Sequence, residues 1–165
     1  MQKWLILGYG NADRQDDGLA WHVLARLARQ LGRGVPQEPE LDFEFEDLNP
    51  VFLFVLQLTP ELAELVAAFD QVCFVDAHTG AIPYEIQVLR LEAQFQNSPF
   101  THHMTPETLL SFCDSLYGHS PQATLVSIHG YEFGFSRRLS ASADALADQA
   151  VEKIFNLPGF PSPGN

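Results

Sequence analysis

The chain has 165 residues, of which 46% are hydrophobic, and this length and composition predict one globular domain with its own core. Lys and Arg number 9 against 21 Asp and Glu, so the net charge of −12 disfavours nucleic acid and anionic membranes as partners. The two cysteines lie far apart in apolar segments, which indicates neither a disulfide framework nor a Cys-x-x-Cys metal site. The first apolar run is too short for a signal peptide or a membrane span, and we expect a soluble, cytoplasmic monomer.

The first predicted unit consists of a strand, a glycine turn and a helix. Residues 3–8, KWLILG, form a continuous apolar run that is typical of a strand buried on both faces of a parallel sheet. Asp16 or Asp17 is placed to cap the helix that follows, and Gly32 is placed to end it. The apolar residues of this helix recur at helical spacing: Ala20, Val23, Leu24, Leu27, Ala28 and Leu31.

The middle of the chain predicts further strands around one helix. Thr59, Pro60 and Glu61 supply a cap, a proline for the first turn and an acid that favours a helix N-terminus, so we expect a helix that reaches Phe69. Residues 85–91 mix polar and apolar positions and predict an edge strand of open orientation. The remaining apolar runs predict strands at residues 41–47, 51–58 and 71–77.

The last part of the chain repeats the alternation of helix and strand. Thr105, Pro106 and Glu107 predict the start of a helix that ends near Gly118, residues 123–130 predict a strand, and Ser140 is placed to cap a final helix. Strands that alternate with amphipathic helices predict a three-layer α/β/α sandwich with a largely parallel twisted sheet. We expect this single domain to span residues 1–157, followed by a flexible tail at 158–165.

Polar side chains follow several predicted strands, where α/β folds bind their ligands. Asp16 and Asp17 follow the first strand, Asp76 and His78 end the strand at 71–77, and His102 and His103 lie in a loop before a helix. Two carboxylates and an imidazole are a coherent ligand set for zinc, nickel or iron(II). The spacing of these residues is not diagnostic by itself, because only the fold can bring them together.

Structural roles are the alternative for each of these residues. Asp16 and Asp17 could cap a helix, Asp76 could fix a turn, and His78 is expected to be a polar loop residue. His102 and His103 could be a solvated pair. Structural roles are also expected for the other histidines, His22, His119 and His129.

Standard nucleotide and hydrolase motifs find no support. Asp13 stands where the dinucleotide fingerprint needs a small residue after Gly8 and Gly10. A phosphate-binding loop, a Gly-x-Ser-x-Gly elbow and a His-Glu-x-x-His helix are all missing from the sequence.

Three segments of the chain form a set of motifs in a fixed order: GYGNADRQDDGLA, FVDAHTGAIP and THHMTPETLL. In sequence and order, these segments resemble the motifs of the hydrogenase maturation proteases. The resemblance implies an endopeptidase that removes a short C-terminal extension from the large-subunit precursor of a nickel-iron hydrogenase after nickel insertion. It also implies that Asp17, Asp76 and His102 are the catalytic and metal-contacting residues, with His103 as a neighbouring alternative to His102.

The expected cofactor is therefore nickel that the substrate carries, with zinc or another divalent metal possible in isolation. No Ser or Cys nucleophile is evident, and Asp16 is assigned to helix capping before a role as general base. Two other functions stay open on the sequence. One is a nickel- or zinc-binding chaperone that inspects the precursor without cutting it, and the other is a domain that binds a small metabolite at the glycine turn.

Overall fold

The computed structural model describes residues 1–41, 48–94 and 104–162. Its centre is a five-stranded sheet in the order β2-β1-β3-β5-β4, in which β4 is antiparallel to β5 and the other neighbours are parallel. The strands are β1 (Trp4–Tyr9), β2 (Val51–Val55), β3 (Gln71–His78), β4 (Ile86–Leu91) and β5 (Gln122–His129). The helices are η1 (Gln15–Gly18), α1 (Leu19–Gln30), η2 (Pro60–Leu62), α2 (Ala63–Ala67), α3 (Pro106–Tyr117) and α4 (Ala141–Phe155).

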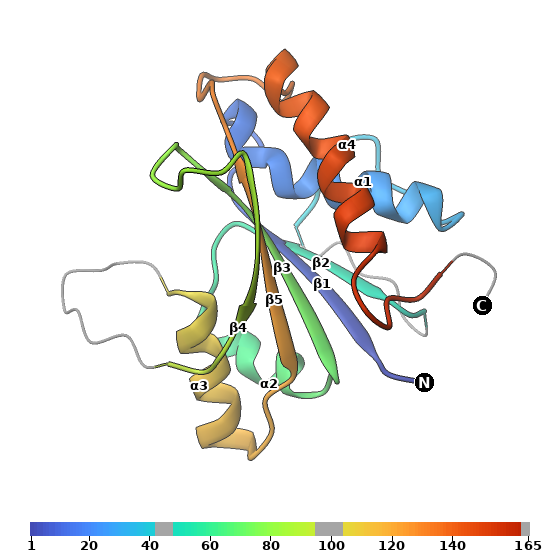
Figure 1. The fold of residues 1–165 in the computed structure, drawn as a ribbon, viewed down its shortest axis with the longest axis vertical. Helices are drawn as coiled ribbons and strands as arrows, with labels where there is room; N and C mark the ends of the chain where they lie inside the picture. Colours follow the sequence, from blue (N-terminus) through green and yellow to red (C-terminus); the bar gives the residue numbers. More distant parts are fainter. Residues whose placement is uncertain (42–47, 95–103, 163–165) are drawn as a thin grey trace.

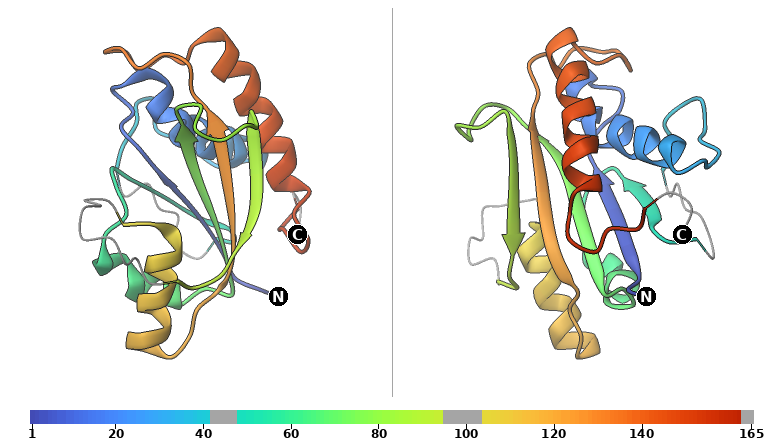
Figure 2. Two further views of the ribbon diagram at one scale, coloured as in Figure 1. Left: turned by 60° about the vertical axis from the view of Figure 1, so that its left-hand side comes forward. Right: turned by 45° about the vertical axis from the view of Figure 1, so that its right-hand side comes forward.

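The helices cover the two faces of the sheet in separate pairs. α1 and α4 pack together on one face, and α2 and α3 lie on the other (Figures 1 and 2). The prediction of a three-layer α/β/α fold with a largely parallel sheet is therefore confirmed, as is the edge position of residues 85–91. The predicted strand at 41–47 falls almost entirely on residues 42–47, which lie outside the described residues.

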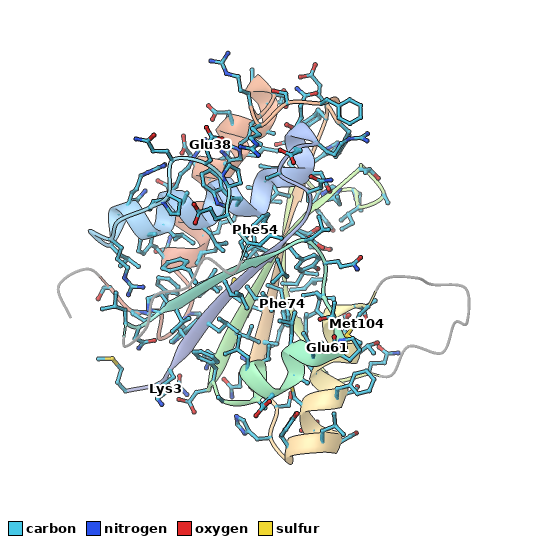
Figure 3. All side chains as sticks on the ribbon, turned by 180° about the vertical axis from the view of Figure 1, so that it is seen from behind. Lys3, Glu38, Phe54, Glu61, Phe74 and Met104 are labelled. Carbon is cyan, nitrogen blue, oxygen red and sulfur yellow. The ribbon has the colours of Figure 1, made fainter. Side chains whose placement is uncertain are left out.

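Each face of the sheet has its own apolar core. Phe54 belongs to the core beneath α1 and α4, whereas Phe74 belongs to the core beneath α2 and α3 (Figure 3). Phe160, which lies in the predicted tail, is buried and packs edge-to-face against Trp4 and Phe155. Both cysteines are buried, as expected of small apolar side chains.

The helix starts agree with the sequence where the cap is local. The hydroxyls of Thr105 and Ser140 accept hydrogen bonds from the third residues after them, at the N-termini of α3 and α4. Gly118 ends α3 in the left-handed conformation, with a φ of 67°. Thr59 makes no side-chain cap, so that detail of the prediction is wrong, although Pro60 does begin the first turn.

Asp16 and Asp17 do not cap a helix either. Both lie inside η1, and neither η1 nor α1 has a side-chain hydrogen bond at its N-cap. The capping prediction is therefore wrong for both acids, and their structural roles differ from each other.

In the described part of the chain, no helix is both long enough and apolar enough to cross a bilayer.

Candidate functional site

A cavity of about 470 Å³ opens at the carboxyl ends of β1, β2 and β3. Asp17 and Asp76, which the sequence placed in one site, both line it. The other lining residues are Tyr9, Gly10, Asn11, Leu56, Gln57, Leu58, Ala77 and Met104. Met104, which is labelled in Figure 3, lies two residues before the start of α3 and contributes to the cavity wall from the segment that leads into this helix.

The glycine turn after β1 places Asp17 at the cavity. Gly10 has a φ of 145°, and a Cβ atom on it would lie 2.1 Å from the carbonyl oxygen of Asp17. Only glycine therefore allows this close approach of the two backbone segments. The backbone N–H of Asn11 then donates to Oδ2 of Asp17 at 2.8 Å, which orients the carboxylate.

Asp76 is the most unusual carboxylate of the site. Its Oδ2 accepts a hydrogen bond of 2.8 Å from the Tyr9 hydroxyl, whereas its buried Oδ1 has no partner among the described residues. Burial raises the pKa of Asp76, and the neighbouring Ser127 hydroxyl and the Tyr9 hydrogen bond only partly oppose this shift. Ser127 lies close enough to act on the charge of the carboxylate but outside hydrogen-bond geometry for Oδ1. A buried carboxylate oxygen without a donor is costly, so it marks a position that is suited to a cation or a proton.

Tyr9 is a site residue that the sequence reasoning missed. Burial, followed by the negative charge of Asp76, raises the pKa of the Tyr9 phenol, so this group stays protonated and donates. The available signal was its position as a polar side chain at the end of the first strand, between Gly8 and Gly10. Its partner lies 67 positions away in the chain, and no local pattern connects the two residues.

Asp16 is a structural carboxylate and not part of the cavity lining. It is fully buried, with Oδ1 accepting from the backbone N–H of Ser140 and Oδ2 from the Ser140 hydroxyl, Tyr131 N–H and Glu132 N–H, at 2.7 to 3.0 Å. Burial alone would raise the pKa of Asp16, but these hydrogen bonds outweigh it and the pKa is lowered. The suggestion that Asp16 acts as a general base is therefore wrong, because it is sealed from solvent and its oxygens are occupied.

His78 is not a polar loop residue, as the sequence suggested, but the buried last residue of β3. Its Nδ1 accepts from Gly80 N–H at 3.1 Å and its Nε2 lies 2.9 Å from the Tyr84 carbonyl, so the neutral tautomer that donates from Nε2 satisfies both partners. His129 stacks between His78 and Tyr131, with ring centroids 5.0 and 4.0 Å apart. The hydrogen bonds of His78 and the ring stacking of His129 therefore give both imidazoles structural roles.

Structural surroundings also account for the two remaining described histidines. The Nε2 atom of His22 lies 3.1 Å from the Arg137 carbonyl oxygen, and that of His119 lies 2.9 Å from the Phe69 carbonyl oxygen. Burial lowers the pKa of His22, so its imidazole is neutral at pH 7.

The third predicted ligand, His102, and its alternative His103 lie outside the described residues. Within residues 1–41, 48–94 and 104–162, no group of three or more His, Cys, Asp or Glu side chains could hold a metal ion. The structure thus brings together two members of the predicted set, Asp17 and Asp76. Met104 lies two positions after His102 and lines the same cavity.

The cavity offers oxygen ligands and an acid–base group. None of its described lining residues is Ser, Thr, Cys or Lys, so the lining supplies no ordinary side-chain nucleophile. Cys73 and Cys113 are buried elsewhere, and burial raises their pKa values to about 12 and about 11. Carboxylates can ligate a divalent cation or accept a proton from water, and Asp17 and Asp76 offer both kinds of chemistry at this cavity.

Solved structures with a similar fold match this chain over most of its length. The chain superposes on the hydrogenase maturating endopeptidase HybD from E. coli with a TM-score of 0.63 and 19% identity, covering 93% of this chain and 90% of that one. The [NiFe] hydrogenase maturation protease HycI from Thermococcus kodakarensis gives a TM-score of 0.62 at 18% identity, covering 93% and 90% of the two chains. No family model and no curated protein sequence matches the chain.

An uncharacterized protein from Wolinella succinogenes is 26% identical, with a TM-score of 0.58 and coverage of 96% of this chain and 98% of that one. Nearly the whole chain is therefore accounted for by one architecture. The resemblance that the three sequence segments indicate is confirmed in three dimensions, and this chain has the fold of the hydrogenase maturation proteases.

Proposed function

We propose that this protein is an endopeptidase that removes the C-terminal extension of a nickel-iron hydrogenase large-subunit precursor after nickel insertion. The observation that carries the proposal is the unpartnered Oδ1 atom of Asp76, buried at a cavity that Asp17 also lines. The proposal also draws on the shared fold with HybD and HycI and on the order of the three motifs. The chemistry of the cavity, rather than the fold alone, connects these observations to an activity.

Nickel enters this proposal as part of the substrate. Asp17 and Asp76 would contact nickel that the precursor already holds, and His102 would complete the set from the segment that precedes Met104. Two carboxylates and an imidazole suit a divalent metal of this kind, and the Asp76 oxygen without a donor fits a cation. Bound nickel would supply Lewis-acid polarisation at the scissile bond.

The residues of this chain would position the peptide tail and the carboxylate that contacts the metal. The apolar side chains of Leu56, Leu58 and Met104 would hold the tail against the cavity wall. Asn11 N–H fixes one oxygen of Asp17, and the side chain is only half-buried, so its other oxygen would be free to contact the metal. A cut would then require both the tail and the metal to be in place, which makes cleavage follow nickel insertion.

A processing assay tests the proposal. Purified protein is incubated with nickel-loaded and nickel-free precursor, and the loss of the extension is followed by intact mass. We expect cleavage of the nickel-loaded precursor only, and loss of cleavage in Asp17→Asn, Asp76→Asn and His102→Ala variants that keep their fold. Full activity of Asp76→Asn would refute the site.

The assay also separates the proposed enzyme from the maturation chaperone. A chaperone would bind the nickel-loaded precursor and return it at its original mass. Binding without any change in mass, at enzyme concentrations equal to the precursor, would therefore reject the endopeptidase.

A further inference from the structure

Phe135 is a large apolar side chain on the surface, with 88% of its area exposed. It lies in the connection between β5 and α4, which forms the orange loop at the top of Figure 1. Isolated apolar side chains are common on protein surfaces, so exposure alone has no functional meaning. Phe135 differs because hydrogen bonds fix the backbone on both sides of it.

The segment at residues 14–15 holds the loop immediately around Phe135. Nε and Nη2 of Arg14 donate to the Phe133 carbonyl at 3.1 and 2.9 Å, and Gly134 N–H donates to Oε1 of Gln15 at 2.7 Å. On the other side, the Gln15 N–H donates to the Ser136 carbonyl at 2.8 Å. An aromatic side chain on such a fixed backbone loses little conformational entropy when it binds a partner.

Cationic groups accompany the exposed ring. The guanidinium carbon of Arg14 lies 4.7 Å from the Phe135 ring centroid, within cation–π range. Neither Arg14 nor Arg138 forms an ion pair with an acid in the described part of the chain. The carboxylate of Glu132, in the same loop, forms no ion pair among the described residues either. We call Arg14, Phe135 and Arg138 the Phe135 surface.

Two of the nearby acids, Asp13 and Glu38, are occupied in ion pairs, and a second cavity adjoins the loop. Arg137 forms ion pairs with Asp13 and Glu38, at 2.7 and 2.6 Å, and Glu38 is labelled near the same end of the molecule in Figure 3. The cavity has a volume of about 600 Å³, and Arg26 and Arg138 contribute to its wall. The surface therefore combines a projecting ring with arginines that can meet carboxylates of a partner.

The same contacts fix the Phe135 surface relative to the candidate active site. Arg14 and Gln15 hold the centre of the loop, and Asp16 holds its two ends through Tyr131, Glu132 and Ser140. Asp17 follows directly in η1 and lines the cavity that also contains Asp76. A protein docked on Phe135 would thus lie in a defined position relative to that cavity.

We propose that the Phe135 surface docks the folded body of the protein substrate while the substrate's C-terminal tail occupies the cavity at Asp17 and Asp76. This inference rests on the proposed function and adds a second contact region that is separate from metal recognition. The matching patch on the substrate has an apolar pocket for the phenyl ring and Asp or Glu side chains at its rim, opposite Arg14 and Arg138.

Variants of Phe135 test the docking surface. Phe135→Ala is compared with Leu116→Ala, a matched control because Leu116 is 61% exposed on α3. Binding to immobilised nickel-loaded precursor and cleavage of the same precursor are both measured. We expect Phe135→Ala to raise Kd and KM by about tenfold or more while kcat and the unfolding temperature stay unchanged, as for loss of an aromatic anchor.

The charged part of the surface has its own variant. Arg138→Glu should weaken binding, and the effect should shrink as salt is raised from 50 to 500 mM, because interactions between exposed charges are screened. A Kd for Phe135→Ala within twofold of wild type would overturn the docking inference, whatever the cleavage result.

The two proposals fail in different ways. Wild-type protein that binds the precursor without cutting it would reject the endopeptidase, and the Kd of Phe135→Ala would still decide the docking surface. Wild-type protein that neither binds nor cuts the precursor would reject both. Normal cleavage with normal binding by Phe135→Ala would reject the docking surface alone.

Discussion

The hydroxyl of Tyr9 donates to Oδ2 of Asp76 at 2.8 Å and leaves Oδ1 of the same carboxylate without a partner among the described residues. One donor therefore fixes the orientation of a buried acid while its other oxygen stays available. Tyr9 acts on Asp76 as a positioning residue, in the way that outer-shell groups orient metal ligands.

Replacing Tyr9 by Phe should slow precursor processing by roughly tenfold, because the Asp76 carboxylate would no longer be held in one orientation. The pKa of Asp76, followed by NMR of its carboxyl carbon, should rise further, since the Tyr9 hydrogen bond lowers it. Tyr84→Phe is the matched control, because Tyr84 is 58% exposed. An unchanged Asp76 titration in Tyr9→Phe would show that the hydroxyl does not position this carboxylate.

The raised pKa of Asp76 has a consequence for stability. As pH rises above about 3.9, the unfolded chain releases this proton while the folded protein retains it, so the free energy of unfolding falls. Asp76→Asn removes this titration. Urea unfolding between pH 4 and 7, in the presence of a chelator, should therefore show the wild type losing stability relative to Asp76→Asn as pH rises. Parallel pH profiles for the two proteins would contradict the raised pKa.

Substitutions of the adjacent carboxylates Asp16 and Asp17 should affect different properties, with Asp16→Asn acting mainly on stability and Asp17→Asn mainly on processing. Asp16→Asn should lower the free energy of unfolding by about 2–3 kcal/mol, since charge-assisted hydrogen bonds to a buried acceptor are lost. Asp17→Asn should cost about 1 kcal/mol or less, because the one hydrogen bond found for this side chain, from Asn11, is partly solvent-accessible. Processing should nevertheless be lost in Asp17→Asn.

The contribution of Asp16 to the free energy of unfolding should fall as the pH is lowered. Because its folded-state pKa is lowered, the stabilisation is present above about pH 3.9 and is lost as pH falls through the lower folded value. Denaturant titrations of wild type and Asp16→Asn should converge in acid. A difference that stays constant down to pH 2 would argue that Asp16 stabilises the fold by packing alone.

The two cysteines should be inert in the folded protein. Burial raises the pKa of Cys73 from 9.0 to about 12, so its thiolate fraction at pH 8 falls by roughly a thousandfold. We expect no reaction of native protein with a thiol reagent, complete reaction after unfolding in urea, and unchanged processing after incubation with iodoacetamide. Inactivation that accompanies labelling of Cys73 or Cys113 would instead implicate a thiol in the reaction.

The sequence predicts the layers of this fold well because the evidence for them is local. Apolar runs and helical spacing determine which segments form strands and helices, and Thr105 and Ser140 cap helices through bonds to residues only three positions away. The site is predicted in part, since Asp17 and Asp76 do share a cavity, whereas His102 remains a prediction. Local patterns were insufficient wherever a distant partner decides the role of a side chain.

Asp16 shows this limit most clearly. Its position before a helix favours capping, but its partners lie 115 to 124 residues away, in the connection between β5 and α4. Their N–H groups surround the carboxylate more completely than the local helix start could. Tyr9 was overlooked for the same reason, because its significance comes from Asp76 on the neighbouring strand.

The contact between Gly10 and Asp17 limits which residues of this cavity lining could change. A side chain at position 10 would collide with the Asp17 carbonyl, so this part of the wall cannot change without displacing the acid itself. Leu56, Gln57 and Met104 line the same cavity from other segments, and Leu56 is 53% exposed. We therefore expect substitutions at these three residues to change which peptide tails the cavity accepts, whereas position 10 must remain glycine.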